Sequence, residues 1–273
     1  MSQLDTLPPL RESLAEHGLL ADKSFGQHFL LDLNITRKIA RLAGPLEGQT
    51  VIEVGPGPGG LTRALVEAGA RVIAVEKDSR FLPLLSELAA VSDGRLTLVE
   101  GDALKVDEAA LAGGPGHVVS NLPYNVGTPL LIKWLTGPWR PVSMTLMFQK
   151  EVADRIAAPA GADAYGRLSV VSQALARAKV VMDLPARAFT PPPKVASAVV
   201  RLDPLDDAPS AGEIAALERV TAAAFGQRRK MLRSSLKALG GEALCETAGI
   251  DPNVRAETVP VEGFLRLARA LSS

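Results

Sequence analysis

Thr50-Val51-Ile52-Glu53-Val54-Gly55-Pro56-Gly57-Pro58-Gly59-Gly60 is the most informative run of this sequence. Its first half is an apolar β run, and its second half is a glycine-rich turn with Gly-x-Gly-x-x-Gly spacing. A helical pattern follows over residues 61–68. A strand, a glycine turn and a helix in this order are typical of the first unit of a nucleotide-binding α/β domain. A tight turn without a ligand is the alternative that the spacing alone leaves open.

Strand and helix patterns alternate outward from this stretch. A helix is expected over residues 33–43 with Asp32 as its cap. Downstream, the sequence predicts strands at 71–75, 96–99, 117–120 and 143–148, and helices near 82–90 and 130–135. This alternation predicts a parallel sheet covered on both faces, that is, a Rossmann-like α/β fold. Two more β runs, 179–182 and 196–202, are separated by prolines and are expected at the end of the sheet.

The sequence predicts three parts. Residues 1–22 form a lead-in with at most one short helix, residues 23–207 form the α/β domain, and residues 208–273 form a small helical domain. A proline-containing linker, 203–210, separates the last two parts. The helices expected in the C-terminal part cover residues 212–226, 229–239, 242–249 and 260–271.

The composition excludes several classes of protein. Lys+Arg and Asp+Glu both number 30, so any nucleic-acid surface must come from local clustering of charge. The single cysteine, Cys245, excludes a disulfide framework and a cysteine-rich zinc site, and it fits a reducing compartment. Residues 1–10 lack the apolar core of a signal peptide, and the longest uncharged stretch, 111–132, is interrupted by Gly, Pro and Asn. We therefore expect a cytoplasmic protein without a metal ion or a membrane span.

Two features of the glycine turn favour S-adenosylmethionine over a nicotinamide dinucleotide. Pro56 and Pro58 have no N–H groups, whereas a pyrophosphate needs backbone donors at the start of the helix. Glu53 precedes the first glycine, where its carboxyl group would lie near the cationic end of S-adenosylmethionine. A nicotinamide-dependent oxidoreductase is the alternative that these features oppose.

Acidic residues also end the next two strands. Glu76 can accept hydrogen bonds from both ribose hydroxyls, and Asp102 can accept one from the adenine amino group. The alternatives are a solvated strand end for Glu76 and a helix cap for Asp102. Because the carboxyl ends of parallel strands meet at one edge of a sheet, we expect Glu53, Glu76 and Asp102 to face one crevice.

The motif Asn121-Leu122-Pro123-Tyr124-Asn125 follows the fourth strand and indicates methyl transfer to an amino group. The exocyclic nitrogen of adenine is a poor nucleophile because its lone pair is delocalised into the ring. Hydrogen bonds to the side-chain oxygen of Asn121 and the carbonyl oxygen of Leu122 favour a more pyramidal nitrogen, and Tyr124 can stack on the base. Positioning then carries the reaction without a strong general base. A simple polar turn is the alternative.

The run Arg228-Arg229-Lys230-Met231-Leu232-Arg233-Ser234-Ser235-Leu236-Lys237 is a local basic stripe in a neutral chain, as phosphate binding requires. We expect a helix here with Met231, Leu232 and Leu236 facing inward; a solvated helix face is the alternative. Arg228, Arg229, Lys230 and Arg233 are the main candidates for RNA contacts. Weaker candidates are Lys23, Arg37, Lys38, Arg41, Arg155 and Arg167.

With these motifs, the sequence resembles the KsgA-type small-subunit ribosomal RNA adenine N6,N6-dimethyltransferases from about Lys23 to the C-terminus. The stretches that carry the resemblance include Lys23-Ser24-Phe25-Gly26-Gln27-His28-Phe29-Leu30, Gln149-Lys150-Glu151-Val152-Ala153-Asp154-Arg155, Tyr165-Gly166-Arg167-Leu168-Ser169, Phe189-Thr190-Pro191-Pro192-Pro193-Lys194-Val195 with Ser197, and Phe225-Gly226-Gln227-Arg228-Arg229-Lys230. The resemblance implies an S-adenosylmethionine-binding methyltransferase domain and a helical RNA-binding domain.

The resemblance also implies residue roles. Cofactor contacts are implied at His28, Leu30, Gly55, Glu76, Asp102 and Asn121, and a target base held between Phe189 and Tyr124. Many relatives have Asn at the position of His28, so this contact is expected through a ring nitrogen or the backbone; packing under the N-terminal segment is the alternative.

The implied reaction is dimethylation of two adjacent adenosines in the 3′-terminal hairpin loop of 16S rRNA. The implied partner is the 30S subunit or its precursor, and we expect a monomer with a role in 30S biogenesis. Within the same chemistry, the alternative is a large-subunit rRNA dimethyltransferase of the antibiotic-resistance kind, which residues 189–197 and 227–230 oppose. A non-catalytic ribosome-assembly factor is the other alternative, which the intact Asn121–Tyr124 motif opposes.

Overall fold

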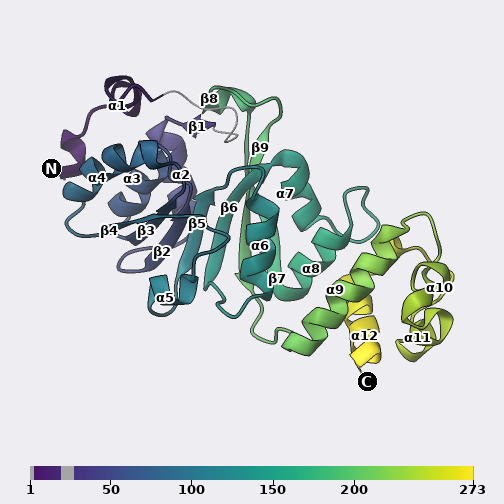
Figure 1. The fold of residues 1–273 in the computed structure, drawn as a ribbon. Helices are drawn as coiled ribbons and strands as arrows, with labels where there is room; N and C mark the ends of the chain where they lie inside the picture. The colour runs from purple at the N-terminus through teal and green to yellow at the C-terminus, as the bar shows by residue number, and fades with distance from the viewer. Residues whose placement is uncertain (1–2, 20–27, 273) are drawn as a thin grey trace. The chain divides into compact units, whose positions relative to one another are not determined.

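The computed structural model describes residues 3–19 and 28–272 (Figure 1). By their internal contacts, these residues fall into two units. The first comprises residues 1–150 and 180–202, and the second comprises residues 151–179 and 203–273. The second unit therefore combines the C-terminal helices with a segment that lies between two strands in the sequence, whereas the sequence pattern placed the boundary near residue 208.

A seven-stranded sheet has the order β4-β3-β2-β5-β6-β9-β7. The strands are β2 (Thr50–Val54), β3 (Arg71–Glu76), β4 (Leu96–Glu100), β5 (His117–Asn121), β6 (Ser143–Gln149), β7 (Ala176–Leu184) and β9 (Ser197–Pro204). The pairs β3–β4, β2–β3, β2–β5 and β5–β6 are parallel, and β9 pairs with β6 in the antiparallel sense. The α/β fold and all the predicted strands are confirmed.

Helices cover both faces of the parallel part of the sheet (Figure 1). On one face lie α2 (Leu33–Leu42), α3 (Gly60–Glu67) and α4 (Leu82–Ala90); on the other lie α5 (Glu108–Ala112) and α6 (Gly127–Thr136). The buried core under α2 and α3 includes Ile39, Val51, Leu65 and Val72, none of them more than 1% exposed. Asp32 caps α2 by accepting a hydrogen bond from the backbone N–H of Asn34, as predicted.

The order of the strands reverses between β2 and β5. From β2 the chain runs outward through β3 to β4, and it then returns to place β5 on the other side of β2. Open α/β sheets bind ligands in the crevice at the carboxyl ends of the strands at such a reversal. The fold therefore places the glycine turn after β2 and the Asn121 motif after β5 next to each other.

The N-terminal region packs on the first unit through α1 (Leu10–Glu16), in which Leu10 and Leu14 are buried. A guanidinium nitrogen of Arg63 in α3 donates a 2.9 Å hydrogen bond to the Pro8 carbonyl oxygen. A short strand, β1 (Phe29–Leu30), pairs antiparallel with β8 (Phe189–Thr190), and Leu30 lies opposite Phe189. The sequence patterns did not predict this two-stranded sheet, because two-residue strands carry no periodicity.

The second unit contains α7 (Lys150–Ala157), α8 (Arg167–Leu175), α9 (Ala211–Gly226), α10 (Leu232–Ser235), α11 (Gly241–Thr247) and α12 (Val261–Ser272). Tyr165, Phe225 and Phe264 form an aromatic cluster inside it, with ring centroids 6.1 and 5.4 Å apart for successive pairs. The Tyr165 hydroxyl donates a 2.9 Å hydrogen bond to the Val259 carbonyl oxygen. Within the described residues, no helix is long and apolar enough to cross a membrane.

The helix predicted over residues 229–239 is wrong. Residues 227–230 form a turn, α10 begins only at Leu232, and a short 3-10 helix follows at Lys237–Leu239. Leu232 and Leu236 are fully buried as predicted, but Met231 is 42% exposed rather than inward-facing. Met231 instead forms an isolated antiparallel bridge with Arg255, so its backbone is extended and its side chain leaves the helical face. The short helices α5, α7 and α8 were not predicted.

Candidate functional site

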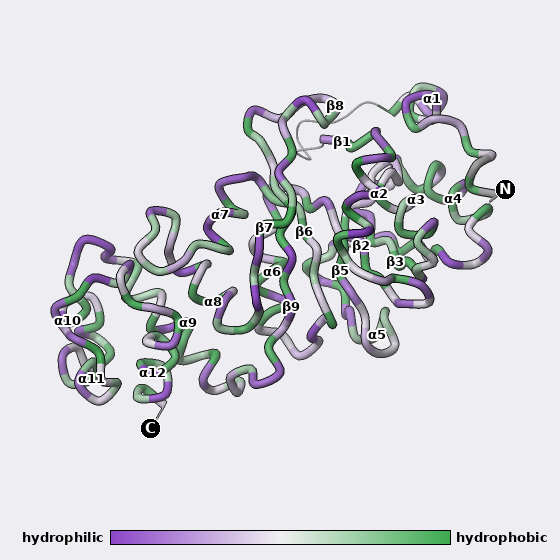
Figure 2. Tube along the Cα trace, turned by 180° about the vertical axis from the view of Figure 1, so that it is seen from behind, coloured by the Kyte–Doolittle hydropathy of each residue, from purple (hydrophilic) through white to green (hydrophobic). Residues whose placement is uncertain are grey.

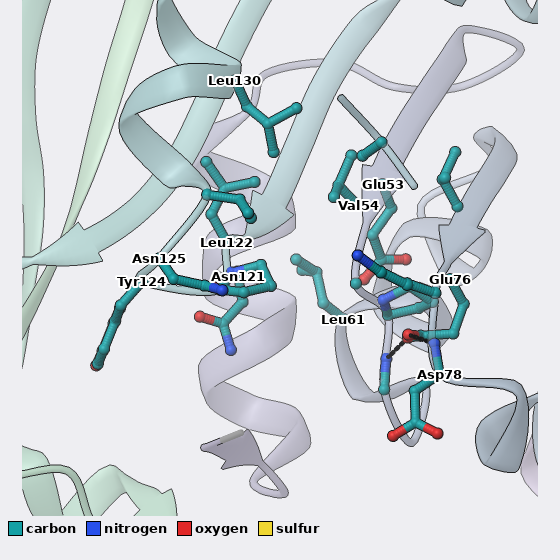
Figure 3. A pocket seen from close by; sticks show the side chains of 18 of the residues that line it. Glu53, Val54, Leu61, Glu76, Asp78, Asn121, Leu122, Tyr124, Asn125 and Leu130 are labelled. Atoms are coloured by element: carbon teal, nitrogen blue, oxygen red, sulfur yellow. Dashed lines mark hydrogen bonds between the residues drawn. The ribbon is translucent and has the colours of Figure 1, made fainter. Parts of the chain in front are cut away.

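A cavity of about 330 Å³ lies at the carboxyl ends of the strands in the first unit. This volume lies within the range typical of small-ligand sites. Figure 3 shows Glu53 and Glu76 on one side of this pocket and Asn121, Leu122 and Tyr124 on the other. The strand-end residues Glu53, Glu76 and Asp102 all line the cavity, so the predicted convergence of the three carboxyl groups is confirmed.

The glycine turn offers few donors to a ligand. Pro56 and Pro58 have no N–H, while the N–H of Gly57 donates to Glu76 Oε2 at 3.0 Å and that of Gly59 donates to the Pro56 carbonyl oxygen at 3.0 Å. Gly57 has a φ of +53°, a conformation that L side chains rarely adopt. Since every N–H of this turn from residue 56 to 59 is missing or already used, the turn is unsuited to cradling a pyrophosphate.

Glu76 is held rigidly at the end of β3. Its Oε1 accepts a 2.8 Å hydrogen bond from the N–H of Asp78, and its Oε2 accepts the bond from Gly57 (dashed in Figure 3). Burial raises the pKa of Glu76, and the backbone hydrogen bonds act in the opposite direction. Each carboxylate oxygen keeps a second lone pair, so Glu76 can still accept ribose hydroxyls.

Glu53 is 1% exposed and lines the same cavity. Its Oε2 accepts a 2.7 Å hydrogen bond from the Thr62 hydroxyl, and no cation within the described residues forms an ion pair with it. Burial raises the pKa of Glu53 to about 8, and the neighbouring charge of Glu76 adds to this shift. A cationic group of a bound ligand would supply the positive charge that an ionised Glu53 needs and that no side chain of the described residues provides.

Asp102 closes a turn and lines the pocket. It does not cap a helix, because the following helix α5 is capped by Asp107, and the contact of Asp102 with adenine stays a prediction. Its Oδ1 accepts a 3.0 Å hydrogen bond from the N–H of Leu104, and its Oδ2 pairs with the Lys77 ammonium at 3.0 Å. The hydrogen bond from Lys77 is the largest cause of the lowered pKa of Asp102. Asp102 is therefore an ionised acceptor after β4, and β3 and β2 separate that strand from the strand of Asn121.

The Asn121 turn presents unused acceptors. The Pro123 carbonyl oxygen accepts hydrogen bonds from the N–H groups of Val126 and Gly127, each at 3.1 Å, which fixes the turn at the start of α6. The Asn121 side-chain amide donates to the His28 carbonyl oxygen at 3.4 Å. In the described part of the chain, no donor reaches Oδ1 of Asn121 or the carbonyl oxygen of Leu122. Both oxygens are available to a ligand, as the predicted chemistry requires.

His28, Leu30 and Gly55 all line the pocket, as the predicted cofactor contacts require. Nδ1 of His28 lies 2.8 Å from the Pro191 carbonyl oxygen, so Nδ1 carries the proton and Nε2 is left as the acceptor or a second donor. The His28 ring lies 5.7 Å from the Tyr124 ring. The described range 28–272 begins at this histidine, so residues 23–27 of the same motif lie outside the described residues.

Tyr124 and Phe189 are not brought together as two faces of a base site. Tyr124 lines the pocket, is half-buried, and its hydroxyl lies 2.8 Å from the Ser197 hydroxyl. Phe189 is 3% exposed and packs in the apolar cluster with Leu30 and Leu184. Its ring does not line the cavity, so its role in stacking stays a prediction.

The basic turn, by which we mean Arg228, Arg229 and Lys230 together with Arg233 of α10, is exposed at every cation. Arg228, Arg229, Lys230 and Arg233 all face solvent, and the tube in Figure 2 is hydrophilic just before α10. Arg228 differs from the others because its guanidinium donates a 2.9 Å hydrogen bond to the Asp163 carbonyl oxygen. The turn thus has one anchored cation, and the other three present their charges to solvent.

The weaker RNA candidates divide by their partners. Arg37 forms a two-bond ion pair with Glu67, and Arg155 pairs with Glu151 one turn earlier in α7. Lys38, Arg41 and Arg167 are exposed, and Lys23 lies outside the described residues.

The sequence patterns did not predict the residues that hydrogen-bond to the side chains of the site. Thr62 follows Glu53 by nine residues and lies in α3, and Ser197 lies at the start of β9, remote in sequence from Tyr124. Asp78, 6% exposed and at the pocket, follows Glu76 by two residues, a local signal that could have been used. The first two contacts depend on tertiary packing and leave no spacing pattern.

Comparison with known proteins gives a consistent result. The family model described as ribosomal RNA adenine dimethylase matches residues 18–273. The chain is 73% identical over 268 residues to a protein of Phenylobacterium zucineum named ribosomal RNA small subunit methyltransferase A, covering 98% of this chain and 94% of that protein. It is 76% identical over 251 residues to a protein of the same name from Caulobacter vibrioides, covering 92% and 97%.

Solved structures agree with the fold. A dimethyladenosine transferase from Plasmodium falciparum superposes with a TM-score of 0.74 at 25% identity, covering 88% of this chain and 96% of that one. The 23S rRNA methyltransferase ErmE superposes with a TM-score of 0.71 at 25% identity, covering 90% and 100%. The likeness extends over both units of the chain.

Proposed function

Because the chain belongs to the ribosomal RNA adenine dimethylase family, we propose that it transfers methyl groups from S-adenosylmethionine to two adjacent adenosines in the 3′-terminal hairpin loop of 16S rRNA. The small-subunit target is favoured by relatives that carry the name small subunit methyltransferase A over nearly their whole length. The single observation that carries the chemistry is the pair of unused oxygens, Oδ1 of Asn121 and the carbonyl oxygen of Leu122, at the pocket.

These oxygens suit the amino group of adenine. Each can accept one N–H of the exocyclic nitrogen, and two such bonds favour a pyramidal nitrogen whose lone pair points away from the ring. The turn is stiffened by Pro123, whose carbonyl oxygen holds the first N–H groups of α6. The nitrogen is therefore oriented before reaction, and its proton can leave to water afterwards without a general base.

The pocket fits S-adenosylmethionine better than a dinucleotide. Glu76 and Asp102 supply acceptors for ribose and adenine, and the donor-poor turn at Gly57 does not favour a pyrophosphate. Glu53 offers a buried carboxyl near the cationic groups of the ligand. When bound, S-adenosylmethionine supplies an electrophilic methyl group. His28, Leu30 and Gly55 would complete its contacts, as would the Asn121 amide.

Tyr124 is the proposed stacking partner of the target base. Its ring lines the pocket, and the hydrogen bond with Ser197 fixes its tilt. Phe189 can serve as the second face only after its ring leaves the apolar cluster, since it is 3% exposed here. The proposal therefore includes a movement of the β8 segment when RNA binds.

Arg228, Arg229, Lys230 and Arg233 are proposed to bind rRNA phosphates. Their side chains form an exposed basic turn in a chain with no net charge, so the attraction is local. Unpaired loop bases cost less to place in a pocket than paired ones, which fits a hairpin target. We further propose that the protein acts as a cytoplasmic monomer on the 30S subunit or its precursor and contributes to 30S biogenesis.

The test is methylation of unmethylated 30S subunits with labelled S-adenosylmethionine, followed by nucleoside analysis. The proposal predicts N6,N6-dimethyladenosine with the wild type and almost none with Asn121→Ala. Gly212→Ala serves as the control variant, since nothing lies within 4 Å of a Cβ built there. Free 23S rRNA is the parallel substrate: methylation of it in place of 30S subunits would favour a large-subunit target. Full activity of Asn121→Ala would refute the proposed chemistry.

A further inference from the structure

Lys133 in α6 has an ammonium group that is matched by three oxygens. Its Nζ donates to the Val106 carbonyl oxygen at 2.7 Å and to the Ala103 carbonyl oxygen at 3.1 Å, and it lies 2.9 Å from Oε1 of Glu108. Two of its three N–H donors are therefore used by backbone carbonyl oxygens, and the Glu108 carboxylate supplies the counter-charge. Both carbonyl oxygens belong to the turn between β4 and α5.

The Glu108 carboxyl holds the lysine in place. Glu108 is 5% exposed, and the same Oε1 accepts a 2.7 Å hydrogen bond from the Trp134 indole N–H. Trp134 follows Lys133 in α6 and is 1% exposed. The Lys133 side chain is 28% exposed, but the buried Glu108 carboxylate and the two carbonyl oxygens together leave its ammonium little freedom, so its position defines where the turn must lie.

The turn that Lys133 holds forms one end of the pocket. Gly101, Asp102, Ala103 and Leu104 line the cavity, and the Asp102 carboxylate closes the turn by accepting the N–H of Leu104. The same helix begins directly after the Asn121 turn, and its Leu130 also lines the cavity. Helix α6 therefore touches the pocket at one end directly and at the other through Lys133.

We propose that Lys133 is a positioning residue for the adenosine end of the pocket: its two hydrogen bonds to the carbonyl oxygens of Ala103 and Val106 fix the 101–107 turn so that Asp102 and its neighbours meet the cofactor in one geometry. Lys133 does not line the cavity and acts only through the turn. The inference rests on the proposed binding of S-adenosylmethionine. It predicts that loss of Lys133 weakens cofactor binding and leaves the chemistry at Asn121 intact.

The variants separate positioning from folding. Lys133→Met alone keeps the apolar stem but leaves the Glu108 carboxylate buried without its cation, which can unfold the protein. The double variant Lys133→Met/Glu108→Gln removes both charges and keeps an acceptor for Trp134. Glu108→Gln alone keeps the bonds from Lys133 to the two carbonyls. Lys105→Arg changes an exposed side chain of the same turn while keeping its charge near Asp102, and it serves as the second control.

The measurements use the full chain. Calorimetry gives the Kd values for S-adenosylmethionine and for methylthioadenosine, which keeps the adenosine end and lacks the amino-acid end. Methylation assays on 30S subunits give kcat at saturating cofactor. We expect Kd for both ligands to rise about tenfold in the double variant, with kcat and the KM for 30S subunits nearly unchanged. Lys105→Arg should match the wild type, and Glu108→Gln, which keeps the two carbonyl bonds but loses the counter-charge, should fall between the wild type and the double variant.

The measurements distinguish a failure of the proposed function from a failure of the positioning role of Lys133. A wild-type protein that binds no S-adenosylmethionine overturns the proposed function itself. A wild type that binds, together with a double variant whose Kd equals that of Glu108→Gln, overturns only the positioning role. A double variant that loses kcat at saturating cofactor while keeping its Kd also overturns it, because the effect would then lie outside the cofactor end.

Discussion

The Thr62 hydroxyl donates a 2.7 Å hydrogen bond to Oε2 of Glu53, and this carboxyl is 1% exposed at the pocket. One neutral hydroxyl does not offset the cost of burying a carboxylate. With a pKa of about 8, Glu53 is mostly protonated at neutral pH in the free protein. The folded protein therefore holds Glu53 next to the glycine turn as a neutral acid, and this makes the free energy of unfolding depend on pH.

Glu53 should make the free energy of unfolding depend on pH. Below pH 4.5 the carboxyl is protonated in both the folded and the unfolded chain; between about 4.5 and 8 only the folded chain keeps the proton. The folded state binds more protons in this window, so stability falls as pH rises, by up to about 1.4 kcal/mol per pH unit. Urea unfolding at several pH values measures the slope.

Glu53→Gln is the matched control, because the amide has the shape of the protonated acid. The variant should be more stable than the wild type above pH 6, and the difference should grow up to about pH 8. Glu76 also has a raised pKa but is present in both proteins and cancels in the difference. Parallel curves for the two proteins would show that folding does not raise the pKa of Glu53.

The contributions of the Tyr124 ring and of its hydroxyl can be tested with two different substitutions. Tyr124→Phe loses the 2.8 Å hydrogen bond with Ser197 but keeps the aromatic face, so we expect methylation to fall less than about tenfold. Tyr124→Ala removes the stacking face and should lower kcat/KM by roughly another tenfold or more. Both are measured with labelled S-adenosylmethionine on 30S subunits. Equal losses in the two variants would assign the role to the hydroxyl and not to the ring.

Gly60 is required where β1 crosses the glycine turn. A Cβ at this position would lie 2.5 Å from the Leu30 carbonyl oxygen, which is backbone and cannot rotate away. Gly60→Ala should therefore destabilise the protein by about 1–3 kcal/mol and weaken cofactor binding, since Leu30 lines the pocket. Thermal denaturation and calorimetry measure the two effects.

Gly212→Ala in α9 is the control for Gly60→Ala, with nothing within 4 Å of the added Cβ. It should change stability by no more than about 1 kcal/mol, and in the stabilising direction. If Gly60→Ala behaves in the same way, the β1 segment is not fixed against the turn.

The basic turn predicts a change in salt dependence. Replacing Arg229, Lys230 and Arg233 by Gln should weaken rRNA binding and reduce the slope of log K against log salt by about 0.7–0.9 for each RNA phosphate that the variant no longer neutralises. Arg228 is left in place because it also holds the Asp163 carbonyl oxygen. Filter binding over a salt series gives the slope.

The control keeps the charges and changes the side chains: Arg229→Lys, Lys230→Arg and Arg233→Lys together. This variant should retain the salt slope, because counterion release depends on charge. Cofactor affinity should be unchanged in both variants. An unaltered slope in the Gln variant would remove this turn from the RNA surface.

From the residues alone we could predict the parallel strands and the residue types at the ends of β2, β3 and β5. Such features are local: apolar runs set the strands, and the glycines after Val54 or the proline after Leu122 set the turns. Asp32 was predicted as a cap for the same reason, and it caps α2. The predicted helix over 229–239 failed where Met231 bridges to Arg255, because a tertiary contact overrode a helical pattern.

The contacts that hold the site in place depend on how the elements pack, which no local pattern predicts. The contacts of Thr62 with Glu53, of Ser197 with Tyr124 and of Lys133 with the 101–107 turn each join two separate elements that share no periodicity. Packing also places Phe189 in the apolar cluster with Leu30 and not at the cavity. The order of residues shows which side chains follow each strand. Burial and contact across the fold, which depend on every element at once, decide which of those groups are charged, free or already bonded.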